Sequence, residues 1–257
     1  MRTKSAPEGT QAVIRAIRLL KALSHERPDM GLTELGDEFG LSKTTVHRLL
    51  AALESEGLVS RDLERGTYRL GPAVIALGAQ ALSSHDLRAI VQPELEALAE
   101  TTGETATFEV LADTRVLIIS EVPGRHLVTV AAEVGTLWPL HATSSGKAIL
   151  AALGDEHARS LLQPPLERYT RATITNPAKL ATELERVRTR GYATAIEELG
   201  AGAAAVALAL CDSLGKPLGA ISLGGPVSRL DPTRLEELAG ALQASAEKIL
   251  RRLQPQA

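Results

Sequence analysis

Residues 40–59, GLSKTTVHRLLAALESEGLV, combine an apolar helical pattern with a dense polar cluster at one end. Ser42 stands where a helix N-cap is expected and Gly57 where a C-terminal stop is expected, so the stretch predicts a helix from Ser42 to about Glu56. At about 100° per residue, the apolar side chains share one face and Arg48 points the opposite way. The apolar face consists of Val46, Leu49, Leu50 and Leu53.

A helix stabilised only by packing has no need for the polar cluster, whereas a DNA-recognition helix does. The N-terminal residues of such a helix enter the major groove while its inner face holds the domain together. Arg48 can form two hydrogen bonds with a guanine edge, and short hydroxyl side chains at a helix N-terminus suit phosphates or bases. The alternative interpretation is a solvated helix face. The candidate DNA-contacting residues are Ser42, Lys43, Thr44, Thr45, His47 and Arg48, together with Arg61 and Arg65 of the segment that follows.

Two more helices are expected before this one. Residues 11–23 carry apolar side chains at helical spacing. Thr33 is a candidate cap for a short helix, ELGDEF, which stops at Gly40. The recognition helix is therefore predicted to be the third of three.

A β-hairpin is expected directly after the third helix. Residues 58–62 (LVSRD) and 67–70 (TYRL) are predicted to be its strands, with the turn LERG between them. Three helices and a basic hairpin fill the first predicted domain, residues 1–71. This order favours DNA binding over a plain solvated helix.

Charge and composition limit the function classes. The chain has 257 residues and is 44% hydrophobic, which is enough for two domains with real cores. Its single cysteine, Cys211, excludes a disulfide framework and any Cys-based zinc site. No signal-peptide or membrane-length apolar run is seen, so a cytoplasmic protein without a membrane partner is expected. Residues 1–71 hold eleven basic and ten acidic side chains, a balance too mild for a non-specific, nucleoid-type DNA binder.

The remaining sequence predicts a helical connector and an α+β domain. Residues 72–86 are expected to form an apolar linker helix, which could be a dimer contact or a core helix of the second domain. The helical pattern continues to about residue 103, with a restart or kink expected at Pro93. Residues 87–257 mix strands joined by hairpins with strands joined by helices, which argues for α+β and an antiparallel-rich sheet. Strands are expected at 105–111, 115–122, 126–130, 192–198, 204–211 and 219–225, and helices at 144–153, 155–162, 176–191 and 231–253.

Several catalytic and cofactor motifs are matched only in part. SSGK is not a P-loop, because His141 stands where Gly is required and the preceding LWP is not expected to end a strand. GAGAAA, residues 200–205, fits a dinucleotide motif in form but enters a strand instead of a helix. The six histidines are scattered, and Cys211 is predicted to be a small core residue. The sequence predicts no catalytic residue, no metal site and no cofactor, and therefore no enzyme.

Long segments of the chain resemble the IclR family of bacterial transcriptional regulators. LTELGDEFGLSKTTVHRLLAALESEGLVSRDLERGTYRLGPAVIALG is similar to the winged helix-turn-helix of that family. PLHATSSGKAILAAL, RGYATAIEELGAGAAAVALAL and GAISLGGPVSRL are similar to its effector-domain signatures, in the same order. The resemblance implies a GAF-like second domain that binds a small molecule, a linker helix, double-stranded operator DNA as partner, and assembly as a homodimer or a dimer of dimers.

The resemblance also implies an effector site. Ser144 and Ser145 would hold a carboxylate at a helix N-terminus, although they could instead simply cap that helix. Ser222 could likewise be a strand residue that faces solvent, and His141 could order a loop or contact the ligand. The implied effector-binding residues are Leu127, Val130, Ser144, Ser145, Ala195, Ala203, Ala205, Ser222 and Gly224.

The implied pocket departs from members of the family that bind very small oxo-acids. Those members carry acidic, thiol or hydroxyl groups at several late positions, where this chain has Ala195, Ala205 and Gly224. An organic acid larger and more apolar than a two-carbon acid is therefore expected. The predicted function is a ligand-responsive, sequence-specific DNA-binding regulator, with repression favoured over activation. The alternative is a small-molecule-binding module or a metabolic enzyme whose N-terminal helices only dimerise.

Overall fold

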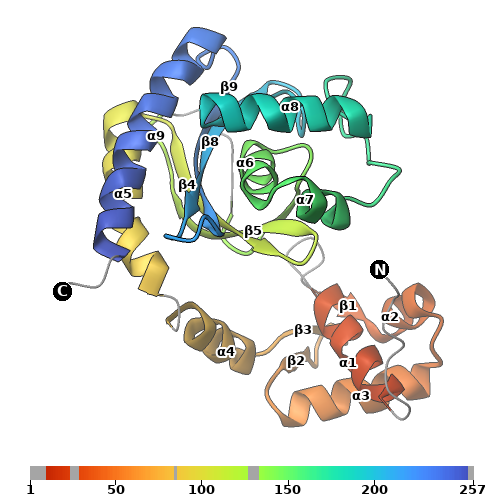
Figure 1. Ribbon diagram of the computed structural model, residues 1–257. Coiled ribbons are helices and arrows are strands. Elements are labelled where there is room, and N and C mark those ends of the chain that lie inside the picture. The colour runs from red at the N-terminus through yellow and green to blue at the C-terminus, as the bar shows by residue number, and fades with distance from the viewer. Residues whose placement is uncertain (1–9, 24–28, 84–85, 127–132, 254–257) are drawn as a thin grey trace. The chain divides into compact units, whose positions relative to one another are not determined.

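The computed structural model describes residues 10–23, 29–83, 86–126 and 133–253 (Figure 1). The chain divides into two compact units, residues 1–84 and 85–257. This division lies near the predicted linker, while the exact domain boundaries at 71 and 86 stay predictions.

The first unit contains the three expected helices, α1 (Gln11–Ala22), α2 (Leu32–Phe39) and α3 (Lys43–Ser55). The apolar face predicted for α3 is confirmed, because Val46 and Leu50 are completely buried. The core that these helices share consists of Leu19, Leu23, Met30, Leu35, Val46, Leu50, Leu53, Val59 and Tyr68.

The predicted helix ends are correct for α3 and partly wrong for α2. Ser42 is the N-cap of α3 as expected, and Gly40 ends α2 in the left-handed conformation at φ +60°. The prediction of Thr33 as the cap of α2 was wrong, because the helix begins at Leu32 with Gly31 as its N-cap. The Gly31 N–H donates to Glu34 Oε2 at 2.8 Å, so a side chain from inside the helix satisfies this amide at the helix start.

The β-hairpin is confirmed as strands β2 (Val59–Asp62) and β3 (Thr67–Leu70), which pair antiparallel. A third strand, β1 (Met30–Gly31), pairs with β3 and was not predicted. In the hairpin turn, Asp62 Oδ1 accepts hydrogen bonds from the backbone N–H groups of Glu64 and Arg65 at 2.9 and 3.0 Å. This turn fixes the backbone from which Arg65 projects.

The apolar stretch after Gly71 forms α4 (Pro72–Ser83) in the first unit and α5 (Asp86–Thr102) in the second. Of the predicted restart or kink at Pro93, the restart was wrong, because Pro93 lies inside α5, while the kink stays a prediction. Proline removes one backbone hydrogen bond from a helix, but Val91 and Leu95 on either side are completely buried. Their packing holds the helix across the missing bond.

The second unit is built on one antiparallel six-stranded sheet of order β6-β5-β4-β9-β8-β7, which confirms the predicted α+β class. Its strands are β4 (Thr105–Ala112), β5 (Arg115–Val122), β6 (Leu137–Pro139), β7 (Ala193–Ile196), β8 (Ala203–Cys211) and β9 (Pro217–Pro226).

Two strand predictions need separate comment. The expected strand at 126–130 falls almost entirely outside the described residues. LWP, which was not expected to form a strand, is β6. It pairs with β5 at the sheet edge, where Pro139 needs no N–H donor for a further neighbour.

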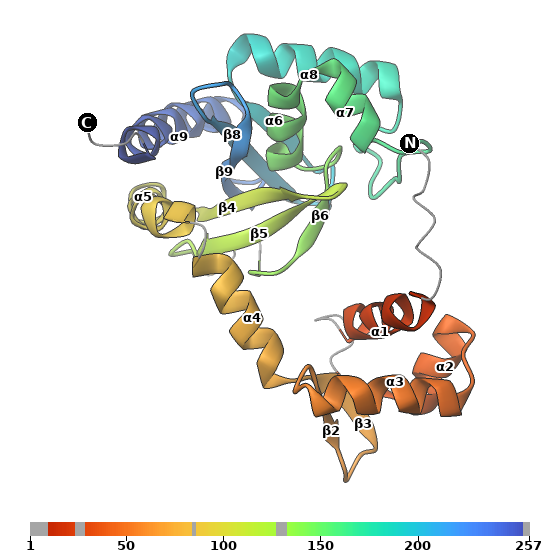
Figure 2. The same cartoon turned by 60° about the horizontal axis from the view of Figure 1, so that its bottom comes forward.

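Helices cover both faces of this sheet (Figure 1; Figure 2 gives a second view). On one face lie α6 (Ser144–Leu153), α7 (Asp155–Leu161) and α8 (Pro177–Arg190), and on the other lie α5 and α9 (Pro232–Leu253). The first five residues of the central strand β4, 105–109, are consequently buried on both faces. Within the described residues no helix combines the length and hydropathy that crossing a membrane requires.

Two glycine substitutions in helices are expected to have opposite effects on stability. A Cβ at Gly146 in α6 would lie 2.2 Å from the carbonyl oxygen of Leu140, so Gly146→Ala should lower the free energy of unfolding by about 2 kcal/mol. Gly240 in α9 has no heavy atom within 4 Å of an added Cβ, and Gly240→Ala should raise stability by up to about 1 kcal/mol. Urea unfolding of both variants checks this pair. Equal effects of the two substitutions would contradict the close approach of α6 to residue 140.

Candidate functional site

The first candidate site is the exposed surface of α3. Lys43, Thr44, His47 and Arg48 are all exposed, while the opposite face of the same helix is buried in the core. The structure therefore gathers the predicted cluster on one accessible side near the N-terminal end of the helix. An exposed basic cluster at a helix N-terminus is suited to a polyanion.

Ser42 and Thr45 form the N-terminal cap of α3 and are also part of the candidate DNA-contacting cluster. The Thr45 N–H donates to Ser42 Oγ at 3.2 Å, and the two hydroxyl oxygens lie 2.9 Å apart. Ser42 is exposed and Thr45 half-buried. Both hydroxyls are oriented by this cap, so they present their remaining hydrogen-bonding capacity in a fixed direction.

The hairpin adds two exposed arginines. Arg61 lies over the ring of the buried Tyr68, with its guanidinium carbon 5.7 Å from the ring centroid. Such cation–π stacking orients the guanidinium without removing its charge. Arg65 projects from the turn that Asp62 orders.

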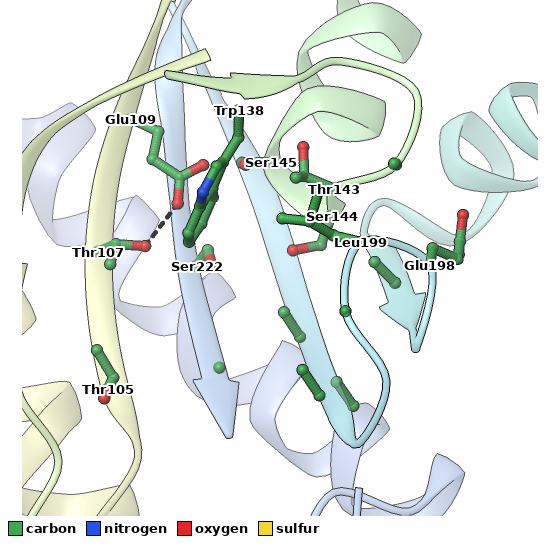
Figure 3. A pocket seen from close by; sticks show the side chains of 17 residues that line it. Thr105, Thr107, Glu109, Trp138, Thr143, Ser144, Ser145, Glu198, Leu199 and Ser222 are labelled. Atoms are coloured by element: carbon green, nitrogen blue, oxygen red, sulfur yellow. Dashed lines mark hydrogen bonds between the residues drawn. The ribbon is translucent and has the colours of Figure 1, made fainter. Parts of the chain in front are cut away.

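The second candidate site is a cavity of about 290 Å³ in the second unit, between the sheet and the start of α6 (Figure 3). Its walls come from the strands β4, β6, β7, β8 and β9, the loop before α6, the first turn of α6 and the loop after β7. The lining residues are Thr105, Thr107, Glu109, Trp138, Ala142, Thr143, Ser144, Ser145, Ala195, Glu198, Leu199, Gly200, Ala203, Ala204, Ala205, Ser222 and Gly224.

Seven of the residues proposed for effector binding meet in this cavity. Ser222 is 6% exposed and faces the cavity instead of solvent. Leu127 and Val130, proposed as an apolar wall, lie outside the described residues. The seven are Ser144, Ser145, Ala195, Ala203, Ala205, Ser222 and Gly224.

The N-terminus of α6 is capped by a residue that sequence reasoning missed. Thr143 Oγ1 accepts the Gly146 N–H at 3.1 Å and donates to the Pro139 carbonyl at 2.9 Å. Ser144 and Ser145 are therefore not the N-cap; they occupy the first two helical positions and are buried at the cavity wall. An anion beside them would face the positive end of the helix dipole.

His141 is not among the residues that line this cavity. Its Nε2 lies 2.8 Å from the carbonyl oxygen of Glu167, and its ring centroid is 5.9 Å from that of Tyr169. These contacts match the interpretation of His141 as a residue that orders a loop.

One polar wall of the cavity was not anticipated. Thr105, Thr107 and Glu109 alternate along β4 and so share one face of the strand, where all three are buried. The alternation in TATFEVL was the available signal. Trp138 of β6 also lines the cavity beside this wall (Figure 3).

Glu109 is the most unusual of these residues. Its side chain is completely buried, and Thr107 Oγ1 donates to its Oε1 at 2.7 Å. Its Oε2 has no hydrogen-bond partner among the described residues. Burial raises the pKa of Glu109 from the usual 4.5 to about 7, against the opposing effect of the Thr107 hydrogen bond.

Glu198, another residue of the cavity wall, belongs to a buried ion pair. Lys147 of α6, 1% exposed, donates to Glu198 Oε1 at 2.5 Å. Burial raises the pKa of Glu198, and the Lys147 ammonium opposes that change. Thr173 Oγ1 in turn donates to the Glu198 backbone carbonyl at 2.6 Å, which fixes the loop after β7.

The cavity offers binding groups: hydroxyls, a helix N-terminus and two carboxyl groups, Glu109 and Glu198, whose Oε2 atoms have no hydrogen-bond partner among the described residues. Among the described residues there is no group of three or more His, Cys, Asp or Glu side chains placed to hold a metal ion. The arrangement supports recognition of a small polar molecule.

Comparisons with known proteins bear on both sites. The family model described as "IclR helix-turn-helix domain" matches residues 12–63, and the one described as "Bacterial transcriptional regulator IclR C-terminal" matches residues 79–251. The chain is 34% identical over 250 residues to the Transcriptional repressor IclR of Escherichia coli strain K12, covering 96% of this chain and 91% of the relative. It is 35% identical over 242 residues to the Acetate operon repressor of Salmonella typhimurium, covering 93% and 88%.

Solved structures resemble the chain over nearly its whole length. An IclR transcriptional regulator from Alicyclobacillus acidocaldarius superimposes with a TM-score of 0.82 at 34% identity, covering 93% of this chain and 97% of that one. An IclR homolog from Microbacterium hydrocarbonoxydans, complexed with 4-hydroxybenzoate, has a TM-score of 0.82 at 26% identity, covering 94% and 98%.

Proposed function

Because the chain belongs to the IclR family of bacterial transcriptional regulators, with a DNA-binding helix-turn-helix and an effector-binding C-terminal domain, we propose that it is a cytoplasmic repressor controlled by a small organic acid. Its operator affinity changes when the acid fills the cavity of the second unit. Two relatives that carry the name repressor support repression over activation. By linkage, operator DNA changes the affinity for the acid by the same factor.

The observation that carries the DNA-binding role is the two-sided character of α3. Val46 and Leu50 fix the helix from within, while Lys43, Thr44 and Arg48 are exposed on its outer side. In this proposal Arg48 reads a base edge, and the other residues of the cluster, together with Arg61 and Arg65 of the hairpin, contact phosphates or neighbouring bases.

The size and lining of the cavity support an acid larger than two carbons. A volume of about 290 Å³ equals roughly ten water molecules at the density of the liquid. Ala195, Ala205 and Gly224 contribute no polar side chain, which leaves Ser222 as the main polar group of the late-strand wall. The relative complexed with 4-hydroxybenzoate is a protein of the same fold with an acid of this size class. The carboxylate would sit at the N-terminus of α6, beside Ser144 and Ser145.

Exposed apolar side chains in the first unit support assembly as a homodimer or a dimer of dimers. Ile75 and Leu77 of α4 are 76% and 58% exposed, and Val13 and Ile17 of α1 are 58% and 47% exposed. Val13 and Ile17 lie one turn apart on the same face of α1, and exposed apolar side chains of this kind are typical of surfaces that are covered in an assembly. A two-fold dimer would read a roughly palindromic operator.

Charged substitutions on α4 are expected to weaken self-association. The double variant Ile75→Glu, Leu77→Glu should raise the dimer dissociation constant by at least about tenfold, because it would place a charge in the apolar contact whichever of these two sides of α4 is covered. Sedimentation velocity across a protein dilution series measures this change. Leu214→Glu, at a 91% exposed position of the second unit, is the control and should leave association unchanged. An unaltered dimer in the double variant would exclude α4 from the contact.

The proposed function is tested by fluorescence anisotropy on duplexes from the region upstream of the gene, across a salt series. Nanomolar binding that resists non-specific competitor and falls with rising salt is expected for a specific regulator. Equal affinity for scrambled duplexes, or no binding at any salt concentration, would favour a binding module or an enzyme whose N-terminal helices only dimerise.

A further inference from the structure

We propose that the effector of this protein carries a hydroxyl group at the end remote from its carboxylate, and that Glu109 selects this ligand by hydrogen bonding to the hydroxyl. The inference rests on the proposed effector role of the cavity and adds the chemistry of the second end of the ligand. It makes Glu109 a specificity-determining residue.

The unpartnered oxygen of Glu109 is the first observation. Thr107 holds Oε1 at 2.7 Å and so fixes the plane of the carboxyl group, while Oε2 has no partner among the described residues. Glu109 lines the cavity and is completely buried, so bulk water does not satisfy that oxygen. Buried polar groups in native proteins are almost always hydrogen-bonded. A partner supplied from the cavity would complete the site.

The protonation state of Glu109 determines which partner fits. With a pKa of about 7, the carboxyl is found in both its protonated and its ionised form near neutral pH. The protonated form needs an acceptor and the ionised form needs a donor, and a hydroxyl group is both. An ammonium group would match only the ionised form, and a second carboxylate would be repelled by it. Glu198 is the other described acidic side chain of the cavity. Its Oε2 also has no hydrogen-bond partner among the described residues, but the Lys147 ammonium binds its Oε1 at 2.5 Å and compensates its charge, whereas Glu109 has no such cation among them.

The rest of the cavity supplies a place for the ligand's opposite end. Figure 3 shows Glu109 and Thr107 on one side, and Thr143 and Ser144 at the start of α6 on the other. The Lys147 ammonium is already bound to Glu198, so the helix N-terminus is the cationic feature left for the ligand's carboxylate. Trp138 stands beside Glu109 and offers an apolar surface to the body of the ligand.

The experiment measures how Glu109 affects pairs of acids that differ only in the remote hydroxyl. Isothermal titration calorimetry would compare benzoate with 4-hydroxybenzoate, 3-phenylpropionate with its 4-hydroxyphenyl analogue, and hexanoate with 6-hydroxyhexanoate, all without DNA. The proteins are wild type, Glu109→Met, Glu109→Gln and the control Glu156→Gln, whose side chain is exposed on α7 away from the cavity. Methionine keeps the approximate shape of glutamate but offers no strong hydrogen bond, whereas glutamine keeps a group that donates and accepts.

The wild type and Glu156→Gln are expected to bind at least one hydroxy acid about tenfold or more tightly than its parent acid, since a site built to bond a hydroxyl rejects the analogue without it. Glu109→Met should reduce that ratio to within about twofold while binding the parent acid as before, and Glu109→Gln should retain most of it. Circular dichroism would establish that each variant is folded.

Three results would overturn the proposal. The first is a preference for the hydroxy acid in Glu109→Met that equals that of the wild type. The second is no such preference in the wild type, as expected if a cavity water satisfies Oε2. The third is no binding of any hydroxy acid in the series. A separate anisotropy arm on operator DNA keeps the two proposals apart. Specific DNA binding by Glu109→Met that no longer responds to the hydroxy acid supports both proposals. Hydroxy-acid binding by the wild type without specific DNA binding supports the role of Glu109 in selecting the ligand but refutes the regulator function.

Discussion

Arg48→Ala is expected to weaken operator binding by roughly 30-fold to 10⁴-fold and to remove the preference for operator over scrambled DNA. A bidentate arginine–guanine contact discriminates by about 1–3 kcal/mol, and a two-fold dimer makes that contact twice. The doubled loss is about 2–6 kcal/mol of binding free energy. Since about 1.4 kcal/mol corresponds to a factor of ten in affinity, this gives the expected roughly 30-fold to 10⁴-fold weakening. Arg48 is exposed on a helix whose other face is buried, so its removal should not unfold the domain.

Two further arginine variants separate base recognition from charge. Arg65→Ala, at the hairpin turn, should weaken binding to all sequences alike and lower the salt slope by about one for each phosphate that the protein no longer neutralises. Arg186→Ala removes the same charge from an arginine of α8 in the second unit whose side chain is 70% exposed, and should change neither quantity. Fluorescence anisotropy with operator and scrambled duplexes measures all three. Full affinity and full sequence preference in Arg48→Ala would remove α3 from the role of recognition helix.

Glu109→Gln is expected to stabilise the second unit by about 3 kcal/mol at pH 8 and to have little effect at pH values below 4.5. The folded-state pKa of about 7 lies above the ordinary 4.5, so between these values the folded protein binds a proton that the unfolded chain has lost. Stability therefore falls as pH rises from 4.5 to 7 and stays reduced above 7. The interval between these two pKa values, at about 1.4 kcal/mol per pH unit, corresponds to a loss of roughly 3 kcal/mol in the free energy of unfolding.

Urea unfolding at about pH 5 and about pH 8 measures this effect, because a neutral amide at position 109 removes the proton linkage. Trp138, the only tryptophan of the chain, lines the same cavity and reports the unfolding of the second unit by its fluorescence. Glu156→Gln serves as the exposed control. A stability difference between Glu109→Gln and wild type that is the same at both pH values would show that residue 109 titrates normally.

Local signals in the sequence were enough for most of the first unit. Ser42 and Gly57 were assigned to the ends of α3 because capping and positive φ are decided by a few neighbouring residues, and Gly57 has φ +67°. The short strands were different. β1 has two residues and β6 three, too few for any periodicity, and each is a strand only because it pairs with a longer neighbour, β3 or β5.

The cavity was only half predictable. Its late-strand residues and Ser144 and Ser145 followed from the family resemblance, whereas Glu109 did not. The alternation in β4 places Thr107 and Glu109 on one face, and in an ordinary antiparallel sheet a polar face is in water. Here helices cover both faces, so the same pattern produces a buried polar wall. That outcome depends on α6 and the loop before it, which come well after β4 in the sequence.

The order of strands in the sheet also determines when the second unit, which contains the cavity, can fold during synthesis of the chain. β4 is the first strand of its unit to leave the ribosome, yet Thr105 pairs with Gly224 of β9, more than a hundred residues later. Such distant pairing is slow to form, and it must wait for almost the whole chain. The core residues of the first unit all lie at or before Tyr68, so its core needs no part of the second sheet. During each round of synthesis the part that carries the recognition helix can therefore fold well before the part that would carry the effector cavity exists.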